Sequence, residues 1–169
     1  MNPGDFLYKI RKIMSLKVYY KDPNAPSPTQ PLTPGVCAVI LNKKGQILLH
    51  KREDNNRWTL PGGKMKVGES ISDCCKREIE EELDIRVEIK KVVGIYTTPD
   101  YVFDFGKGRV FQPFVVAFLC SSASNKFAIN EESEDAGWFS LDEISKLKVV
   151  PNTKRIVNHS LKKTDAFFD

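Results

Sequence analysis

Residues 58–85 read WTLPGGKMKVGESISDCCKREIEEELDI, and this stretch is the starting point for predicting the fold. Its first part holds one proline and three glycines, a composition typical of a turn. In its second part, apolar side chains recur every four residues, at Ile71, Cys75, Ile79 and Leu83. This period predicts an amphipathic helix with one buried stripe. The stretch therefore predicts a tight loop followed by a helix that docks on a core.

Several glutamates of this helix lie beside its buried stripe. Because successive helical residues advance by about 100°, Glu81 and Glu82 lie within about 60° of Glu78, while Glu80 points to the opposite side. Three carboxylates on one face repel one another unless a cation neutralises them. Clustered carboxylate oxygens suit Mg²⁺ or Mn²⁺. From the charges alone, a solvated acidic face is the ordinary alternative.

The spacing of these residues resembles the signature of the Nudix hydrolase superfamily. The match spans 23 residues and meets eight of nine defined positions, namely Gly63, Glu69, Arg77, Glu78, Ile79, Glu81, Glu82 and Ile85. The exception is Asp84, where the family has glycine. A helix end often needs the left-handed conformation, which Asp adopts at modest cost. We therefore expect the departure to weaken the helix cap and to leave the metal site intact.

The resemblance implies an α/β fold, the Nudix α/β/α sandwich around a mixed β-sheet. It also implies a hydrolase that cleaves a pyrophosphate bond in a nucleoside diphosphate linked to another group. By the same resemblance, Mg²⁺ (or Mn²⁺) would be held by Glu78, Glu81, Glu82 and the carbonyl of Gly62. Gly63, Glu69 and Arg77 look structural. A pair between Glu69 and Arg77 would order the loop against the helix.

The resemblance leaves the general base open. In the family, the base is a glutamate of the motif or a glutamate on a loop that follows a later strand. The candidates among the catalytic residues are therefore Glu82, Glu81 and Glu132. Glu132 belongs to the acidic run at residues 131–135, for which a solvated turn is an equally good interpretation.

Substrate-binding residues are harder to identify. Arg52 follows the second predicted strand, where the family often has a basic residue that meets phosphate; a solvated surface arginine is the alternative. Trp58, Tyr101 and Phe103 would suit stacking on a base, although aromatic side chains near strand ends more often belong to the core. The aromatic loop and the N-terminal arm favour ADP-ribose or a nucleotide sugar. The alternatives are a modified nucleoside triphosphate and a non-catalytic nucleotide-binding module, against which the intact glutamates argue.

The rest of the chain predicts strands with a few helices between them. Apolar, β-rich runs predict strands over residues 36–41, 46–51, 85–95 and 111–120, a short strand ending at 138–139, and a loop or loose hairpin over 97–109. A capping box opens a helix at Ser140-Leu141-Asp142-Glu143, and a last helix is expected over residues 152–163. With no repeat and no second core, residues 35–169 form one predicted domain.

Residues 1–34 form a predicted arm. Residues 5–16 have the apolar period of a short amphipathic helix, and residues 22–34 hold five of the ten prolines, which predicts an extended linker. Such a helix would pack on its own domain or on a partner subunit. A homodimer and a plain terminal extension are therefore both open.

Composition limits the other function classes. A chain of 169 residues has the size of one domain, and its net charge of +4 is mild and scattered, which argues against a nucleic-acid polymer as partner. No run approaches the roughly 18 apolar residues of a membrane helix, and the N-terminus lacks a signal-peptide core. Four cysteines without zinc or redox spacing suit a reducing compartment. We expect a cytoplasmic protein with a nucleotide-type small-molecule substrate.

Overall fold

A mixed β-sheet forms the centre of the computed structural model, which describes residues 16–130, 133–162 and 165–169. Within these residues the sheet has seven strands in the order β10-β5-β8-β2-β3-β4, with β9 paired to β3. The strands are β2 (Pro34–Leu41), β3 (Ile47–Arg52), β4 (Trp58–Thr59), β5 (Val87–Tyr96), β8 (Phe114–Ser122), β9 (Ser133–Phe139) and β10 (Phe167–Phe168). The predicted helix over residues 5–16 falls, except for its last residue, outside the described residues.

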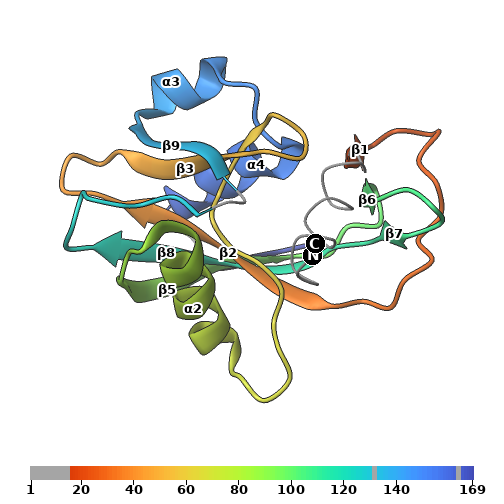
Figure 1. Ribbon diagram of the computed structural model, residues 1–169, viewed down its shortest axis with the longest axis horizontal. Helices are drawn as coiled ribbons and strands as arrows, with labels where there is room; N and C mark the ends of the chain where they lie inside the picture. Colours follow the sequence, from red (N-terminus) through yellow and green to blue (C-terminus); the bar gives the residue numbers. More distant parts are fainter. Residues whose placement is uncertain (1–15, 131–132, 163–164) are drawn as a thin grey trace, which may run out of the picture.

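Helices cover both faces of the sheet (Figure 1). Helix α2 (Ile71–Leu83) packs on one face through Cys75, Ile79 and Leu83, each 0% exposed. On the other face, α3 (Leu141–Lys146) and α4 (Pro151–Ser160) contribute buried aliphatic side chains to a second core cluster. The α/β/α sandwich around a mixed sheet is therefore confirmed. No helix in the described ranges is long and apolar enough to cross a bilayer.

The predicted strands are present with modest shifts at their ends. Residues 36–41, 46–51, 85–95 and 111–120 correspond to β2, β3, β5 and β8, with ends displaced by up to three residues. The largest shift has a chemical reason, because Pro113 has no N–H to donate and separates β8 from the preceding strand. The capping box at Ser140 and Glu143 is confirmed, with both reciprocal hydrogen bonds formed.

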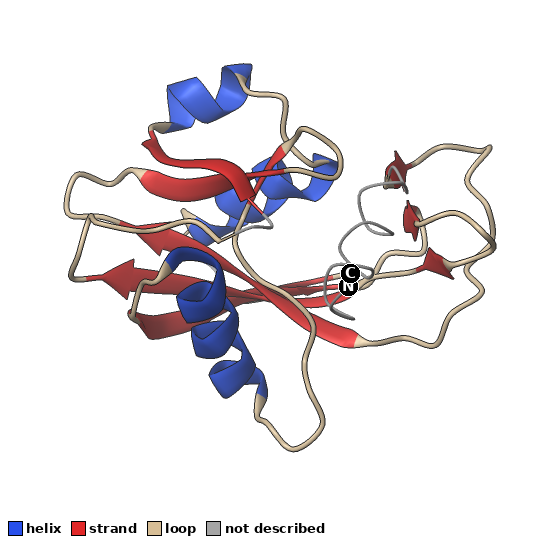
Figure 2. Cartoon of the chain, in the orientation of Figure 1, coloured by secondary structure: helices blue, strands red, loops and turns tan. Residues whose placement is uncertain are grey.

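A second, smaller sheet lies to one side of the domain (Figure 2). It has the order β1 (Lys17–Tyr20), β6 (Tyr101–Asp104) and β7 (Val110–Phe111), so the loose hairpin expected over 97–109 is formed. Strand β1 is not anticipated by the sequence analysis. The proline-rich stretch is also attached to this hairpin, because the backbone N–H groups of Thr29 and Gln30 both donate to the Val110 carbonyl.

The loop of the glutamate motif occupies a gap between two strands. β2 and β3 pair at Leu41 and Ile47, next to their hairpin turn. Farther along β2, the motif loop takes over the pairing: Val36 N–H donates to the Gly63 carbonyl at 2.8 Å and Ala38 N–H donates to the Pro61 carbonyl at 2.9 Å. The loop is therefore held like a short strand beside β2, and it delivers the chain to the start of α2.

Candidate active site

Helix α2 is fixed at both ends. At its start, the Ser70 side chain accepts a hydrogen bond from the Asp73 N–H, which satisfies a backbone donor that has no partner inside the helix. At its end, Asp84 has φ 52° and ψ 38° and donates its N–H to the Glu80 carbonyl. The left-handed conformation expected at Asp84 is therefore present, and an aspartate closes the helix where the family has glycine.

Two glycines of the loop are required by close packing. A Cβ on Gly62 would lie 2.2 Å from the Val36 carbonyl oxygen of β2, and its φ of 149° is strained for any other residue. A Cβ on Gly63 would lie 2.3 Å from Oε2 of Glu78. The loop thus touches β2 on one side and the carboxylates of α2 on the other. The Gly62 N–H donates to Oε2 of Glu82 at 2.9 Å.

Arg77 joins the loop to the helix. Its guanidinium donates to both carboxylate oxygens of Glu69, at 2.7 and 2.8 Å, and to the Lys64 carbonyl at 3.2 Å. The hydrogen bonds from Arg77 and from the Lys66 backbone lower the pKa of Glu69 to about 2. In return, Glu69 raises the pKa of Arg77. The pair suggested by the sequence is present, and it ties the residue before the N-cap to the middle of α2.

The three glutamates of the proposed metal site have different surroundings. Glu78 accepts a hydrogen bond from Arg77 at 2.7 Å, and Glu81 accepts from Arg77 at 3.0 Å and from Lys66 at 3.4 Å. The Glu81 side chain is 52% exposed, whereas that of Glu82 is 8% exposed. Helical angles predict that these glutamates share one face. In the structure Glu81 points to solvent, whereas Glu82 turns toward β3 and the loop and is buried.

The side chains of this site have the chemistry that a hard divalent cation prefers. Their present arrangement does not yet form a binding site for such an ion. No group of three His, Cys, Asp or Glu side chains within the described ranges converges as a formed metal site. Instead, Arg77 and Lys66 neutralise Glu78 and Glu81. The donors are all carboxylate oxygens, which Mg²⁺ and Mn²⁺ prefer. The carbonyl of Gly62 accepts no hydrogen bond from the described residues, while those of Pro61 and Gly63 on either side are both paired.

Glu82 lies next to a buried histidine that the sequence analysis did not select. His50 on β3 is 2% exposed, and its Nε2 is 4.0 Å from Oε2 of Glu82. Its Nδ1 is 2.8 Å from the hydroxyl of Ser133, the first residue of β9. Burial, followed by the charge of Arg52, lowers the pKa of His50 to about 4. The imidazole is therefore neutral at physiological pH.

The segment before β9 is attached to the end of α2. The Ala128 N–H donates to the Leu83 carbonyl at 3.0 Å, and Asn130 donates through its backbone to Glu82 and through its side chain to Glu81, both at 3.2 Å. These bonds satisfy carbonyls that a helix end leaves without partners. Glu132, the general-base candidate, lies outside the described residues.

A sequence signal for His50 and Asn130 is partly present. His50 is one of two histidines and directly follows the apolar run Ile47-Leu48-Leu49, which marks it as a buried polar residue. Because buried polar side chains need hydrogen-bond partners, this pattern marks His50 as a candidate functional residue. Asn130 gives no such signal, because its contact with α2 depends on the path of the chain after β8.

The four substrate-binding candidates differ in accessibility. Arg52 is paired with Asp54, and its charge, with that of Arg57, acts on the Tyr101 hydroxyl. Tyr101 itself is 3% exposed, and burial raises its pKa. Little of the Tyr101 ring is accessible for stacking with a nucleotide base. Phe103 packs edge-on against Tyr101 at 4.8 Å between ring centroids and is half-buried.

Trp58 serves a packing role in this structure. Its ring meets Phe139 edge-on, with centroids 4.7 Å apart, and its backbone pairs with Lys148 and Val150. The half-buried indole therefore joins β4 to the segment before α4. Trp58 therefore packs against the core, which is the alternative interpretation stated above for aromatic side chains near strand ends.

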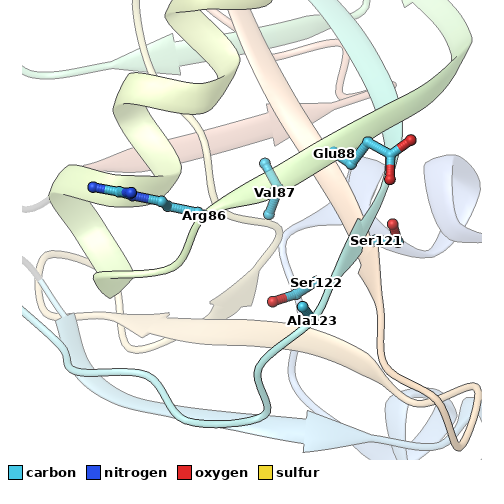
Figure 3. Close-up of a pocket in the computed structure, with 6 residues that line it drawn as sticks. All are labelled: Arg86, Val87, Glu88, Ser121, Ser122 and Ala123. Carbon is cyan, nitrogen blue, oxygen red and sulfur yellow. The ribbon is translucent and has the colours of Figure 1, made fainter.

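A shallow surface depression of about 330 Å³ lies away from the motif loop, at the start of β5 and the end of β8. It is lined by Arg86, Val87, Glu88, Ser121, Ser122 and Ala123 (Figure 3). The Arg86 side chain is 92% exposed and pairs with Glu80 at 3.2 Å. None of the predicted site residues lines this depression, and its open walls give little enclosure for a nucleotide.

Comparisons with known proteins agree with this geometry. A family model described as the NUDIX domain matches residues 31–159. A protein of Bacillus subtilis (strain 168), provisionally named an 8-oxo-dGTP diphosphatase, is 34% identical over 128 residues, covering 75% of this chain and 78% of the relative. Nucleoside triphosphatase NudI of Enterobacter sp. (strain 638) is 30% identical over 126 residues, covering 70% and 89%.

A solved structure extends the likeness to the fold. The crystal structure of an ADP-ribose pyrophosphatase from Streptococcus suis 89-1591 aligns with a TM-score of 0.61 and 27% identity, covering 81% of this chain and 98% of that chain. The family model spans more than half of the sequence and includes the glycine loop, the arginine and the glutamates described above. This chain therefore belongs to the Nudix hydrolase family.

Proposed function

We propose that the protein is a divalent-metal-dependent pyrophosphohydrolase that cleaves a nucleoside diphosphate linked to another group, with ADP-ribose or a nucleotide sugar as substrate. The observation that carries this proposal is the convergence of the glycine loop on α2. Gly63 lies against Glu78, and Gly62 hydrogen-bonds Glu82. This contact places backbone groups and carboxylates in one small region, where hydrolysis of a charged anhydride needs them.

The proposed metal ligands are Glu78, Glu81, Glu82 and the carbonyl of Gly62. When bound, Mg²⁺ or Mn²⁺ would neutralise charge on the phosphoryl oxygens and lower the pKa of the attacking water. Arg77 supports the ligands by holding the loop to the helix through Glu69. It also contacts Glu78 and Glu81, so both carboxylates would exchange this cationic partner for the metal.

Glu132 is the proposed general base, with Glu82 and Glu81 as the alternatives within the motif. The residues on either side of Glu132 support this choice. Asn130 hydrogen-bonds the carbonyl of Glu82, and Ser133 hydrogen-bonds His50 beside the Glu82 carboxylate. A base must lie within reach of the proton that it removes, directly or through one water. Asn130 and Ser133 support the proposal because each hydrogen-bonds a group in the region around Glu82.

A modified nucleoside triphosphate is the second candidate substrate. Two similar proteins favour it by name, the diphosphatase of 8-oxo-dGTP and the nucleoside triphosphatase NudI. The similar solved structure is instead named an ADP-ribose pyrophosphatase. The chemistry at the metal is the same for both classes, because each substrate presents a pyrophosphate bond. Arg52, Trp58, Tyr101 and Phe103 are the proposed substrate contacts, of which Tyr101 offers the least accessible ring because it is 3% exposed.

The remaining proposals concern assembly and location. Residues 1–34 would act as an arm on the domain formed by residues 35–169, and the arm would suit a homodimer. A cytoplasmic location is also proposed, and the free cysteines support it: Cys74, Cys75 and Cys120 are free and buried, and Cys37 is free and half-buried. Thiols of this kind persist in a reducing compartment.

The test is a substrate panel with Mg²⁺ or Mn²⁺. ADP-ribose, nucleotide sugars, dinucleoside polyphosphates and oxidised nucleoside triphosphates would be compared by kcat/KM, with phosphatase coupling to release phosphate. We expect the largest value for ADP-ribose or a nucleotide sugar, and complete loss of turnover in Glu82→Gln. A preference of at least about 10-fold for an oxidised triphosphate would instead establish the second candidate. Tight nucleotide binding without turnover would identify a non-catalytic module.

A further inference from the structure

The carboxylate of Glu82 is held in an unusual place for a charged group. Its side chain is 8% exposed, and its Oε2 accepts a hydrogen bond from the Gly62 N–H at 2.9 Å. A buried carboxylate is costly unless nearby groups satisfy it and fix its direction. A ligand of a metal ion must also present its oxygens in one orientation, and this orientation usually depends on neighbours that do not touch the metal.

His50 lies beside the Glu82 carboxylate. Its Nε2 lies 4.0 Å from Oε2 of Glu82, a dipolar packing contact that is too long for a hydrogen bond. His50 also lies opposite Thr59 in the pairing of β3 with β4, three residues before Gly62. His50 therefore packs on the carboxylate from a strand that pairs with the segment leading into the motif loop.

Ser133 determines how the imidazole is turned. Its hydroxyl is 2.8 Å from Nδ1 of His50, and both residues are buried, at 7% and 2% exposure. The pairing of β3 with β9 brings the two strands together at this point, with Arg52 opposite Ser133 and His50 opposite Ala136. With Nδ1 engaged by Ser133, the other ring nitrogen faces Glu82.

We propose that His50 is a positioning residue that fixes the Glu82 carboxylate against the Gly62 N–H, and that Ser133 orients the imidazole for this task. The inference rests on the proposed function, in which Glu82 is a metal ligand. It assigns a role to a residue outside the glutamate motif, on a different strand. It also explains why a polar ring occupies a position between the apolar Leu49 and the half-buried Lys51.

The two ring nitrogens allow a sharp test by substitution. The amide of an asparagine reaches the place of Nδ1, and that of a glutamine reaches the place of Nε2. His50→Gln would therefore keep the group that faces Glu82, while His50→Asn would keep the bond to Ser133 alone. His50→Phe retains the ring shape and removes both nitrogens.

The chain supplies a matched control in its other histidine. His159 on α4 also places Nδ1 2.8 Å from a hydroxyl, that of Tyr96, but it packs with Tyr96 and Phe167 away from the glutamates. His159→Phe removes an equivalent hydrogen bond. It reports the general cost of losing a histidine from this fold.

The primary measurement is Mn²⁺ affinity without nucleotide, by calorimetric titration, with a thermal melt of each variant. Loss of a group that positions a metal ligand typically costs 10–100-fold, so we expect about 10-fold weaker Mn²⁺ binding in His50→Phe and His50→Asn. His50→Gln should remain within about 3-fold of the wild type, and His159→Phe should be unchanged. At saturating Mn²⁺, kcat on the best substrate of the panel should fall in the same order, with KM within about 2-fold.

Wild-type Mn²⁺ affinity in folded His50→Phe would overturn the inference. Equal Mn²⁺ affinities in His50→Asn and His50→Gln would also overturn it. This comparison is the test if His50→Phe does not fold. Glu82→Gln separates the inference from the function on which it rests. If Glu82→Gln loses Mn²⁺ while the His50 variants do not, only the role of His50 is wrong; if Glu82→Gln binds Mn²⁺ normally, the metal site itself is wrongly assigned.

Discussion

Replacement of Gly62 by alanine should damage both the fold and the reaction. The added Cβ would lie 2.2 Å from the Val36 carbonyl oxygen and 2.7 Å from the Cys37 Cα, whereas ordinary contacts begin at 3.4 Å. Both neighbours are backbone atoms of a central strand and have no room to move. The loop would therefore have to retreat from β2 by about 1 Å, since side-chain contacts in a packed interior tolerate little overlap.

The expected magnitude follows from the bonds that this movement strains. The backbone conformation at φ 149° costs about 1–3 kcal/mol for a residue with a side chain. Weakening the hydrogen bonds of Val36 and Ala38 to the loop adds about 1 kcal/mol. A total near 3 kcal/mol lowers Tm by about 6–12 °C for a chain of this size. A displacement of about 1 Å at the reacting groups costs on the order of 100-fold in rate.

Gly45→Ala is the matched control for this prediction. Gly45 lies in the hairpin turn with φ 73°, and a Cβ there would meet nothing within 4 Å. Gly45→Ala should lower the free energy of unfolding by about 1 kcal/mol and Tm by a few degrees, because of backbone strain alone. The assay is a thermal melt with kcat on the best substrate at saturating Mn²⁺. If folded Gly62→Ala kept kcat within about 2-fold of the wild type, the loop would have no part in catalysis.

Four further predictions address the helix, its pairs and the arm. In Gly63→Ala the new Cβ would lie 2.3 Å from Oε2 of Glu78 and would displace this carboxylate, so calorimetry should show about 10-fold weaker Mn²⁺ binding with little change in Tm. The hydrogen bonds from Arg77 and from the Lys66 backbone lower the pKa of Glu69 from 4.5 to about 2, so they stabilise the fold above pH 4.5 and this contribution disappears as the pH falls through about 2; Glu69→Gln should match wild-type Tm only at the acid end of that range. Ile79→Ala should cost about 3 kcal/mol in a denaturant titration, since the side chain is 0% exposed, and a loss below about 1 kcal/mol would contradict its packing. Light scattering of the chain without residues 1–15, which keeps β1, should give about half the mass of the full chain, and an unchanged mass would show that residues 1–15 of the arm do not hold a dimer together.

The predictions from sequence were strongest where the pattern is local. The buried stripe of α2, the capping box at Ser140 and the left-handed Asp84 each depend on residues within a few positions of one another. Such features form from short-range geometry and survive in almost any tertiary setting. The hairpin strands β2 and β3 were predicted for the same reason.

The predictions were weakest where distant segments meet. Strands β1 and β10 are short and have little apolar period, and they exist because they pair with β6 and β5. Gly94 illustrates the point, since a Cβ there would lie 2.4 Å from the Phe167 carbonyl oxygen. No residue close to Gly94 in the sequence indicates that β10 packs against it.

The family, the α/β/α fold and the set of glutamates can be predicted from the sequence, because a motif of 23 residues combines a turn, a helix and its acidic face within one continuous stretch. The differences among these carboxylates depend on tertiary contacts. Helical angles place Glu78, Glu81 and Glu82 on one face, yet Glu82 is buried between the loop and His50 while Glu81 is exposed to solvent. The difference arises because burial depends on which strand lies opposite, and β3 and β9 reach this helix from elsewhere in the chain.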